Sequence, residues 1–155
     1  MTDEARANID SVEDLHAVVG ARFHETDQRY TSGRRRLVEL LFTARRPLTQ
    51  PEIIERDPAL PASSIYRNLD ALERAGLIAR VSPGTEHARY ELSESLQGHH
   101  HHLVCVDCGH IEDVRLGEAL EAIVDRELSG AAADAGFMPL FHNVDLHGRC
   151  EVCAR

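Results

Sequence analysis

Hydrophobic residues recur at helical spacing in two stretches near the start of the chain. In the first, residues 11–23, the positions that share one side are Val12, Leu15, Val18, Val19 and Phe23. The second begins at Ser32, a residue type that caps the first turn of a helix, and its shared face consists of Leu37, Leu40 and Leu41. Both stretches predict amphipathic helices.

A shorter helix is predicted in LTQPEIIERDPAL. Thr49 is its expected N-cap, and Glu52 follows three residues later, which is the pattern of a capping box. Pro51 suits the first helical turn because its φ angle is already helical. Ile53 and Ile54 supply a short apolar face.

PASSIYRNLDALERAGLIARV predicts a further helix that begins after Pro61, with Ser63 as its expected cap and Gly76 at its end. Its apolar stripe consists of Ile65, Leu69 and Leu72. Two short helices joined by a tight, proline-marked turn form a helix-turn-helix, whose second helix enters the major groove of DNA. The polar face at the start of that helix presents Ser64, Tyr66, Arg67 and Asn68.

The pattern changes to alternation in LIARVSPGTEHARYEL, around a Pro83-Gly84 turn, which predicts a β-hairpin. A helix-turn-helix followed by such a hairpin is a winged helix. An amphipathic helix pair alone is more often part of a core than a DNA reader. The neighbouring Tyr66 and Arg67, the wing and the positive charge of this region together favour DNA binding.

Residues 93–98 separate this half of the chain from a second half. HHLVCV and FMPLFHNVDLHG have the pattern of strands, and LGEALEAIVDREL predicts a helix. The residues of that helix expected to face inward are Leu116, Leu120, Ile123, Val124 and Leu128. The two halves predict an α+β fold, with a winged helix followed by a small α/β domain.

The charge distribution supports different tasks for the two halves. The net charge of −9 by itself disfavours a nucleic-acid partner. Residues 29–89, however, hold eleven arginines against seven acidic residues, whereas residues 93–155 hold four arginines against eleven acidic residues. No stretch approaches the roughly 18 apolar residues of a membrane helix, and the opening MTDEARANIDSVED does not resemble a secretory signal. A cytoplasmic protein is therefore expected.

Four cysteines form two Cys-x-x-Cys pairs, one at Cys105 and Cys108 and one at Cys150 and Cys153. In a cytosolic chain this arrangement indicates a structural zinc site, because four thiolates complete a tetrahedral shell. Such an ion would also stabilise a half of modest apolar content. A disulfide or thiol switch is the alternative for each pair, but one closed site accounts for all four thiols more simply.

Four consecutive histidines, from His99 to His102, precede the first cysteine pair. Side chains alternate on a strand, so His99 and His101 point one way while His100 and His102 point the other. Four imidazoles in succession suit neither a core nor a plain surface strand, which indicates two sets of metal ligands. The candidate partners elsewhere in the chain are Glu91, Asp113, Glu121 and His142.

Four segments occur in the order SSIYRNLDALERAGLI, ARYEL, HHHHLVCVDCG and GRCEVC. In these segments the chain resembles the ferric uptake regulator (Fur) superfamily of bacterial metal-dependent repressors. The resemblance covers roughly residues 29–153. It implies a homodimer that closes onto double-stranded operator DNA when metal binds. The expected parts are residues 1–92, a winged-helix DNA-binding domain with an N-terminal helical extension, residues 93–98, a hinge, and residues 99–155, a metal-binding dimerisation domain.

The resemblance also implies two ligand sets besides the cysteines. The family's regulatory site matches Glu91, His100, His102 and Asp113. Its dimerisation-domain site matches His99, His101, Glu121 and His142, with a one-residue shift at Glu121. The residues expected at the DNA are Ser64, Tyr66, Arg67, Asn68 and Arg34.

One position departs from the family pattern. Many relatives have a further histidine ligand just before the helix-turn-helix, where this chain reads RRPLTQ with Pro47. Either Glu91 alone links the metal to the DNA-binding half, or His87 in the wing substitutes.

The ligand chemistry favours iron(II) as the regulatory metal, because oxygen-rich sets suit harder ions. Zinc-sensing relatives place a cysteine near the position of Glu91, and the chain has none there. Zinc is the second alternative, and manganese, or peroxide sensing through bound iron, is the third. Asp113, where iron sensors often have glutamate, keeps the peroxide alternative open.

Other functional classes would use some of the same residue types. A zinc hydrolase or deaminase needs an open coordination position beside a general base. The chain lacks His-Glu-x-x-His, and it lacks the deaminase pattern of His-x-Glu with Pro-Cys-x-x-Cys. A metal-storage module would not require a helix-turn-helix. The sequence therefore predicts a transcriptional regulator rather than an enzyme.

Overall fold

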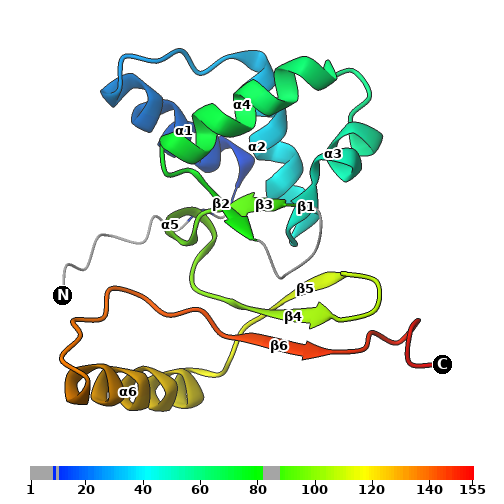
Figure 1. Cartoon of the computed structure of the whole chain (residues 1–155). Coiled ribbons are helices and arrows are strands. Elements are labelled where there is room, and N and C mark those ends of the chain that lie inside the picture. The colour runs from blue at the N-terminus through cyan, green and yellow to red at the C-terminus, as the bar shows by residue number, and fades with distance from the viewer. Residues whose placement is uncertain (1–8, 10, 82–87) are drawn as a thin grey trace. The chain divides into compact units, whose positions relative to one another are not determined.

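The structure of the chain is a computed structural model that describes residues 9, 11–81 and 88–155. It divides into two units, residues 1–99 and residues 100–155, and each unit contains a three-stranded sheet (Figure 1). The division falls within the run of histidines, between His99 and His100. In the part of the chain that the structure describes, no helix is both long enough and apolar enough to span a membrane.

The first unit combines helices with a small antiparallel sheet of order β1-β3-β2. Its helices are α1 (Val12–Glu25), α2 (Ser32–Ala44), α3 (Gln50–Arg56), α4 (Ala62–Arg74) and the short α5 (Glu94–Gln97). Its strands are β1 (Leu48–Thr49), β2 (Ile78–Val81) and β3 (Arg89–Leu92). The succession of α3, α4 and the paired strands β2 and β3 is that of a winged helix. The predicted Pro83-Gly84 turn lies outside the described residues.

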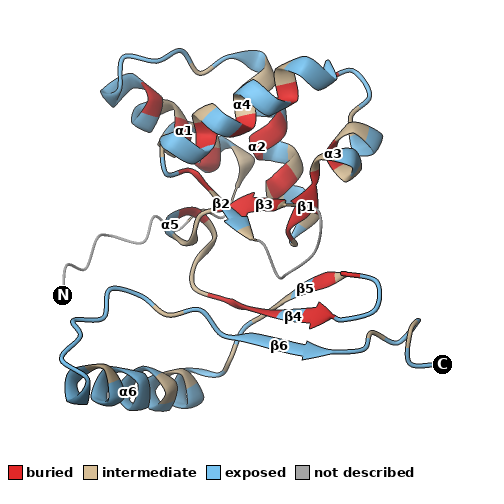
Figure 2. Cartoon of the chain, in the orientation of Figure 1, coloured by how far each residue is buried: buried red, intermediate tan, exposed pale blue. Residues whose placement is uncertain are grey.

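The core of the first unit forms where the predicted apolar stripes of the helices meet (Figure 2). Its fully buried side chains include Leu15, Val19, Phe23, Leu37, Val38, Leu48, Ile53, Ile65 and Leu72. Burial of each large aliphatic or aromatic side chain contributes about 1.5–3 kcal/mol. Because three of these residues come from α1, the N-terminal helix is part of the core of this unit.

Two helices of this unit begin differently from the prediction. α2 is capped by Thr31, whose hydroxyl accepts a hydrogen bond from the N–H of Arg34 at 3.4 Å, so Ser32 is the first helical residue rather than the cap. α4 follows Pro61 without a side-chain cap, so Ser63 lies inside its first turn. Extended backbone at Thr31 and Pro61 sets both starts, and a hydroxyl further along cannot move them.

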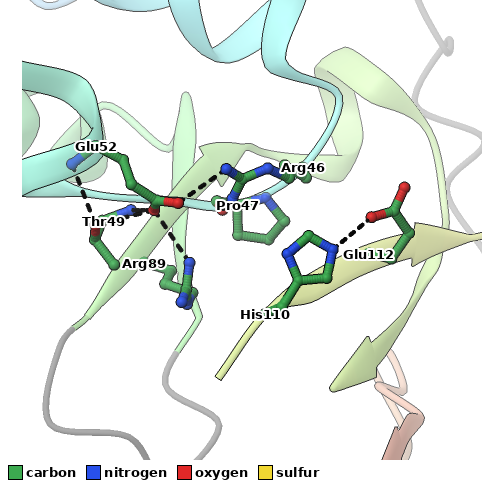
Figure 3. Close-up of polar contacts among 7 residues, drawn as sticks. All are labelled: Arg46, Pro47, Thr49, Glu52, Arg89, His110 and Glu112. Carbon is green, nitrogen blue, oxygen red and sulfur yellow. Dashed lines mark hydrogen bonds and ion pairs between the residues drawn. The ribbon is translucent and has the colours of Figure 1, made fainter. Parts of the chain in front are cut away.

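The predicted capping box of α3 is confirmed, and it belongs to a larger ion-pair network (Figure 3). The backbone N–H of Thr49 donates to the Glu52 carboxylate at 2.7 Å. Arg46 and Arg89 donate to the same carboxylate at 2.8 and 3.1 Å. Burial raises the pKa of Glu52, but the hydrogen bonds from Thr49 and Arg46 outweigh burial and lower this pKa to about 2. Glu52 thus joins α3 to strand β3.

Glu52→Gln is expected to lower the free energy of unfolding by about 1–2 kcal/mol near neutral pH, because the charged partner of two arginines is lost. The pKa of Glu52 is lower in the folded chain than its ordinary value of 4.5. Its stabilising contribution is therefore present above that value and is lost as the pH falls towards about 2.

Urea unfolding of the parent chain and of Glu52→Gln, at several pH values between neutral and acidic, measures this contribution. Glu55→Gln is the matched control, because Glu55 is exposed on the same helix. A stability difference between parent and Glu52→Gln that stays constant as the solution is acidified would contradict the network.

The second unit is built around a mixed sheet of order β5-β4-β6. The strands are β4 (His101–Cys105), β5 (Ile111–Val114) and β6 (Asp145–Gly148), and a long helix, α6 (Glu118–Asp134), connects β5 to the segment before β6. β4 is the central strand, and it pairs antiparallel with β5 and parallel with β6. Side chains of β4 can therefore contact side chains from β5 on one edge and from β6 on the other.

Two predictions for this unit are wrong. The segment FMPLFHNVDLHG was predicted as a strand throughout, but only Asp145–Gly148 forms one. The predicted helix exists, but it begins at Glu118, so the predicted Leu116 precedes it. Its apolar side chains do not face inward: Leu120, Ile123 and Leu128 are exposed, and Val124 is half-buried. Periodicity identifies the apolar face of a helix, and it does not say that the surface covering this face belongs to the same chain.

Candidate metal centres and nucleic-acid interface

The pairing of β4 with β6 brings the two Cys-x-x-Cys pairs together. Cys105 ends β4 and lies across from Gly148 of β6, two residues before Cys150. The four sulfur atoms lie within 4.8 Å of one another. The Sγ atoms of Cys108 and Cys150 are 3.8 Å apart, about the separation of two thiolates that share a tetrahedral zinc ion with Zn–S bonds of roughly 2.3 Å. This geometry fits a four-cysteine zinc site.

Local hydrogen bonds favour the thiolate form of one of these cysteines. The backbone N–H of Cys150 donates to Sγ of Cys105 at 3.3 Å. Several hydrogen bonds lower the pKa of Cys105 to about 6, and this one makes the largest contribution. A hydrogen bond to the side chain of Cys150 raises the pKa of Cys153 to about 12. Neighbouring thiolates repel one another, so a divalent ion that binds all four would favour their ionisation.

His102 of β4, His100 just before this strand and Asp113 of β5 bring two imidazoles and a carboxylate together. The rings of His100 and His102 meet edge to face, with their centroids 5.1 Å apart. β5 places Asp113 across from His102, and Nε2 of His102 lies 4.0 Å from Oδ1 of Asp113. The ligand atoms of these three side chains lie within 4.8 Å of one another, as a divalent cation with nitrogen and oxygen ligands requires.

A second set forms on the other face of β4. Nε2 of His101 lies 3.0 Å from one carboxylate oxygen of Glu121, and Nε2 of His142 lies 3.2 Å from the other. The rings of His101 and His142 are stacked, with their centroids 5.5 Å apart. Glu121 comes from α6 and His142 from the segment before β6. The adjacent residues His101 and His102 of β4 therefore take part in separate sets, as the alternation of side chains along a strand predicts.

Two predicted ligands, Glu91 and His99, belong to the first unit. Glu91 lies on β3, and His99 follows α5, with its Nδ1 atom 2.9 Å from Glu94. Their part in the two sets stays a prediction. His87, the alternative ligand from the wing, lies outside the described residues.

Two acidic side chains outside the predicted sets also contact these histidines. Asp145 of β6 lies 3.2 Å from Nδ1 of His102, and Asp125 of α6 lies 3.1 Å from Nδ1 of His142. The sequence did carry a signal for Asp125, which follows Glu121 by one helical turn. It carried none for Asp145, because the register between β4 and β6 cannot be derived from either strand alone.

α4 presents the predicted DNA-reading residues at its start. Tyr66 is 66% exposed, Arg67 is exposed, and Ser64 and Asn68 are half-buried. Three of the four line a surface depression that the first residues of α2 complete; its lining is Thr31, Ser32, Gly33, Arg34, Leu60, Pro61, Ser64, Arg67 and Asn68. Two arginines beside the positive ends of two helices make this surface suitable for DNA phosphates.

Arg34 is held at this depression by contacts that the sequence patterns did not predict. Its guanidinium lies over the ring of Phe23, 4.6 Å from the centroid, and its Nη1 atom donates to the carbonyl of Arg29 at 2.6 Å. A Cβ atom on Gly33 would lie 3.0 Å from Nδ2 of Asn68, so glycine permits the close approach of α2 and α4. In the sequence, Phe23 has the pattern of an ordinary core residue, and this pattern does not predict its contact with the guanidinium of Arg34.

Ligand groups in one unit and a winged helix in the other are the combination that the Fur superfamily predicts. A sequence model described as the ferric uptake regulator family matches residues 25–146. The chain belongs to the ferric uptake regulator family. The match begins at the last residue of α1, so most of this helix lies before the matched region.

Individual relatives agree with this assignment. The chain is 29% identical over 102 residues to the ferric uptake regulation protein of Bacillus subtilis (strain 168), an alignment that covers 64% of this chain and 64% of that protein. The chain thus spans less than two thirds of the length of that curated relative.

Two solved structures have the same fold. The Helicobacter pylori ferric uptake regulator Fur matches with a TM-score of 0.75 at 20% identity, covering 95% of this chain and 96% of that chain. A zinc uptake regulator complexed with zinc and DNA matches with a TM-score of 0.56 at 21% identity, covering 93% and 95%. The predicted superfamily and the predicted α+β fold class are confirmed.

Proposed function

We propose that this Fur-family chain is a metal-responsive, DNA-binding transcriptional repressor of metal homeostasis and not an enzyme. The observation that carries the proposal is the pair of imidazole and carboxylate sets on the two faces of β4, in a chain that also contains a winged helix. The solved relatives named above include a regulator whose structure shows three functional metal binding sites and one complexed with zinc and DNA, which supports the same activity here.

Each group of ligands has a proposed role. Cys105, Cys108, Cys150 and Cys153 hold a structural zinc ion. His100, His102 and Asp113, together with Glu91 of the first unit, bind the regulatory metal. His101, Glu121 and His142, together with His99, form the dimerisation-domain site. Glu91 and His99 are included on the strength of the ARYEL and HHHH motifs.

Iron(II) is the proposed regulatory metal, because the set around His102 offers nitrogen and oxygen ligands and no thiolate. Zinc, manganese and iron-dependent peroxide sensing are the alternatives within the same function. A bound divalent cation supplies positive charge that holds carboxylates and imidazoles together. The chain's own contribution is to place His102 on β4, His100 just before it and Asp113 on β5, with Glu91 of β3 as the proposed ligand from the DNA-binding unit.

The proposed active form is a homodimer. The second unit exposes large apolar side chains over α6, the segment after it and β6, including Leu120, Ile123, Phe137, Met138, Leu140, Phe141 and Leu146. Soluble monomers seldom expose a surface of this kind, whereas a twofold dimer covers the same surface on both copies. The acidic charge of residues 93–155 would keep this half away from DNA phosphates.

Metal-dependent DNA binding tests the function directly. Double-stranded DNA selected from a random library by the iron(II)-loaded protein should bind with nanomolar to micromolar affinity, and chelation of the regulatory metal should weaken this binding. Anisotropy titrations with iron(II), zinc and manganese then rank the metals. Equal DNA affinity with every metal and with chelator would contradict the proposal.

Arg67→Ala is expected to weaken DNA binding about 5–150-fold, because a contact from the recognition helix is worth about 1–3 kcal/mol. It should also flatten the dependence of affinity on salt, since fewer counterions are released. Tyr66→Ala should act mainly on the choice of sequence. Arg74→Ala, at the far end of the same helix, is the control. If Arg67→Ala and Tyr66→Ala footprint the selected DNA as the parent does, α4 is not the reading helix.

A further inference from the structure

One histidine in each of the two ligand sets has an acidic side chain at both of its ring nitrogens. The Nε2 atom of His102 faces Asp113 of the set on its own face of β4, at 4.0 Å. Its Nδ1 atom lies 3.2 Å from Oδ1 of Asp145, on the neighbouring strand β6. His102 is itself buried, and its ring lies between these two carboxylates.

His142 repeats this arrangement in the other set. Its Nε2 atom lies 3.2 Å from Glu121, which also contacts His101. Its Nδ1 atom lies 3.1 Å from Oδ1 of Asp125, one turn further along α6. In both sets the inner acid faces Nε2 and the additional acid faces Nδ1.

We propose that Asp145 and Asp125 are outer carboxylates that orient the metal-binding histidines, each accepting a hydrogen bond from Nδ1–H of its histidine. The proposal rests on the proposed function, since it requires that both sets bind metal. Holding the proton on Nδ1 leaves the lone pair of Nε2 free to face the metal. Asp145 and Asp125 are thus positioning residues rather than ligands.

The geometry of the imidazole ring separates the two roles. The lone-pair directions of Nδ1 and Nε2 diverge. An ion bound to Nε2 can therefore also bind the acid that faces Nε2, but it cannot reach the acid that faces Nδ1. Exposure follows the same division: the inner acids Asp113 and Glu121 are 21% and 23% exposed, whereas Asp145 and Asp125 are 33% and 62% exposed. The inner acids therefore sit where a desolvated ion would bind, and the outer acids sit towards water.

Two independent features of the fold create these contacts. The parallel register of β4 and β6 places Asp145 directly across from His102. The helical repeat of α6 places Asp125 four residues after Glu121, on the same face. Since a strand pairing and a helical repeat give the same outcome, the arrangement does not depend on one local conformation.

Removal of an outer carboxylate typically lowers metal affinity 10–100-fold, because the histidine loses its orientation and some of its strength as a donor. An asparagine retains a hydrogen-bond acceptor and loses the charge, so Asp145→Asn and Asp125→Asn are expected at the lower end, about 10-fold. The effect of Asp145→Asn should be the larger of the two, because Asp145 is less exposed.

Cobalt(II) titration of the full-length chain with its cysteine site loaded with zinc, in competition with a chelator, measures the proposal. The parent should show two binding events besides the zinc. Asp145→Asn should weaken one event and Asp125→Asn the other. Asp134→Asn removes the same charge from the exposed end of α6 and is the matched control. X-ray absorption should show an unchanged number of nitrogen and oxygen ligands in both variants.

Long-range ¹H–¹⁵N spectra of the zinc-saturated parent should show His102 and His142 with the proton on Nδ1. The proposal is overturned if Asp145→Asn or Asp125→Asn binds cobalt as tightly as Asp134→Asn does. It is also overturned if His102 or His142 binds the metal through Nδ1. Loss of one oxygen ligand from the metal in Asp145→Asn or Asp125→Asn would show a direct ligand and would overturn it as well. A parent that binds no cobalt at either set would instead refute the proposed function.

Discussion

Cys105→Ser is expected to unfold the second unit and abolish the dimer. The binding free energy of a structural zinc ion, about 10–16 kcal/mol in small zinc domains, is also folding free energy. Apart from Val104, Cys105 and Ile111, the second unit contributes few buried apolar side chains, so it has little else to hold the C-terminal segment against β4. A serine cannot replace the thiolate, and three ligands leave an incomplete shell.

Zinc analysis and hydrogen exchange separate this result from general instability. The variant should lose most of its zinc, and amides of β4, β5 and β6 should exchange rapidly while α2 and α4 stay protected by the core of the first unit. Cys150→Ser should behave in the same way, because it removes a ligand from the other pair. Sedimentation that shows a folded, zinc-free dimer of Cys105→Ser would reject the structural role and favour a redox function for the cysteines.

Local features of the first unit could be predicted because each depends on a few neighbouring residues. The capping box between Thr49 and Glu52 and the stripe on α4 are of this kind, and both appear in the structure. The cap of α2 is a local feature too, but Thr31 and Ser32 carry the same hydroxyl chemistry. Only the backbone conformation distinguishes a cap from a first helical residue.

Burial and side-chain contacts in the second unit could not be predicted from the sequence. The apolar face of α6 was identified correctly, yet Leu120 and Ile123 on this face are exposed in the structure. The spacing of apolar residues in a helix does not say which surface, if any of the same chain, covers them. Likewise, the alternation of the histidines is a property of one strand, whereas the contact between His102 and Asp145 depends on which strand pairs with β4 and in which register. Ligand types could be read from the sequence, and the neighbours that orient them could not.

Replacement of both His100 and His102 by alanine is expected to remove the metal response of DNA binding, while the zinc of the cysteine site and the dimer survive. Binding of an effector typically changes the affinity for a second ligand about 5–150-fold. We expect the regulatory metal to raise the DNA affinity of the parent by such a factor and to leave the DNA affinity of this variant unchanged. The two imidazoles are half of the proposed regulatory set, so their loss leaves Glu91 and Asp113, which are too few ligands to retain the ion.

The alternative pair, His99 and His101, should behave differently. A ligand shifts a conformational equilibrium only by its difference in affinity between the two states. The proposed regulatory set takes Glu91 from the DNA-binding unit, so its ion distinguishes a DNA-competent arrangement from others. In the set around His101, Glu121 and His142 come from the second unit, and the proposed ligand His99 is the residue directly before that unit. Its ion should therefore mainly stabilise the second unit and leave much of the response intact.

Metal titrations of DNA binding, followed by fluorescence anisotropy for both double variants, decide between these assignments. Each titration needs a parallel zinc analysis and sedimentation run, which show that the variant still contains its cysteine-bound zinc and remains a dimer. With that condition met, loss of the response in the His100 and His102 variant alone supports the regulatory role of that face of β4. If the His99 and His101 variant loses the response and the other keeps it, the roles of the two faces are reversed, because each double substitution removes ligands from only one of them.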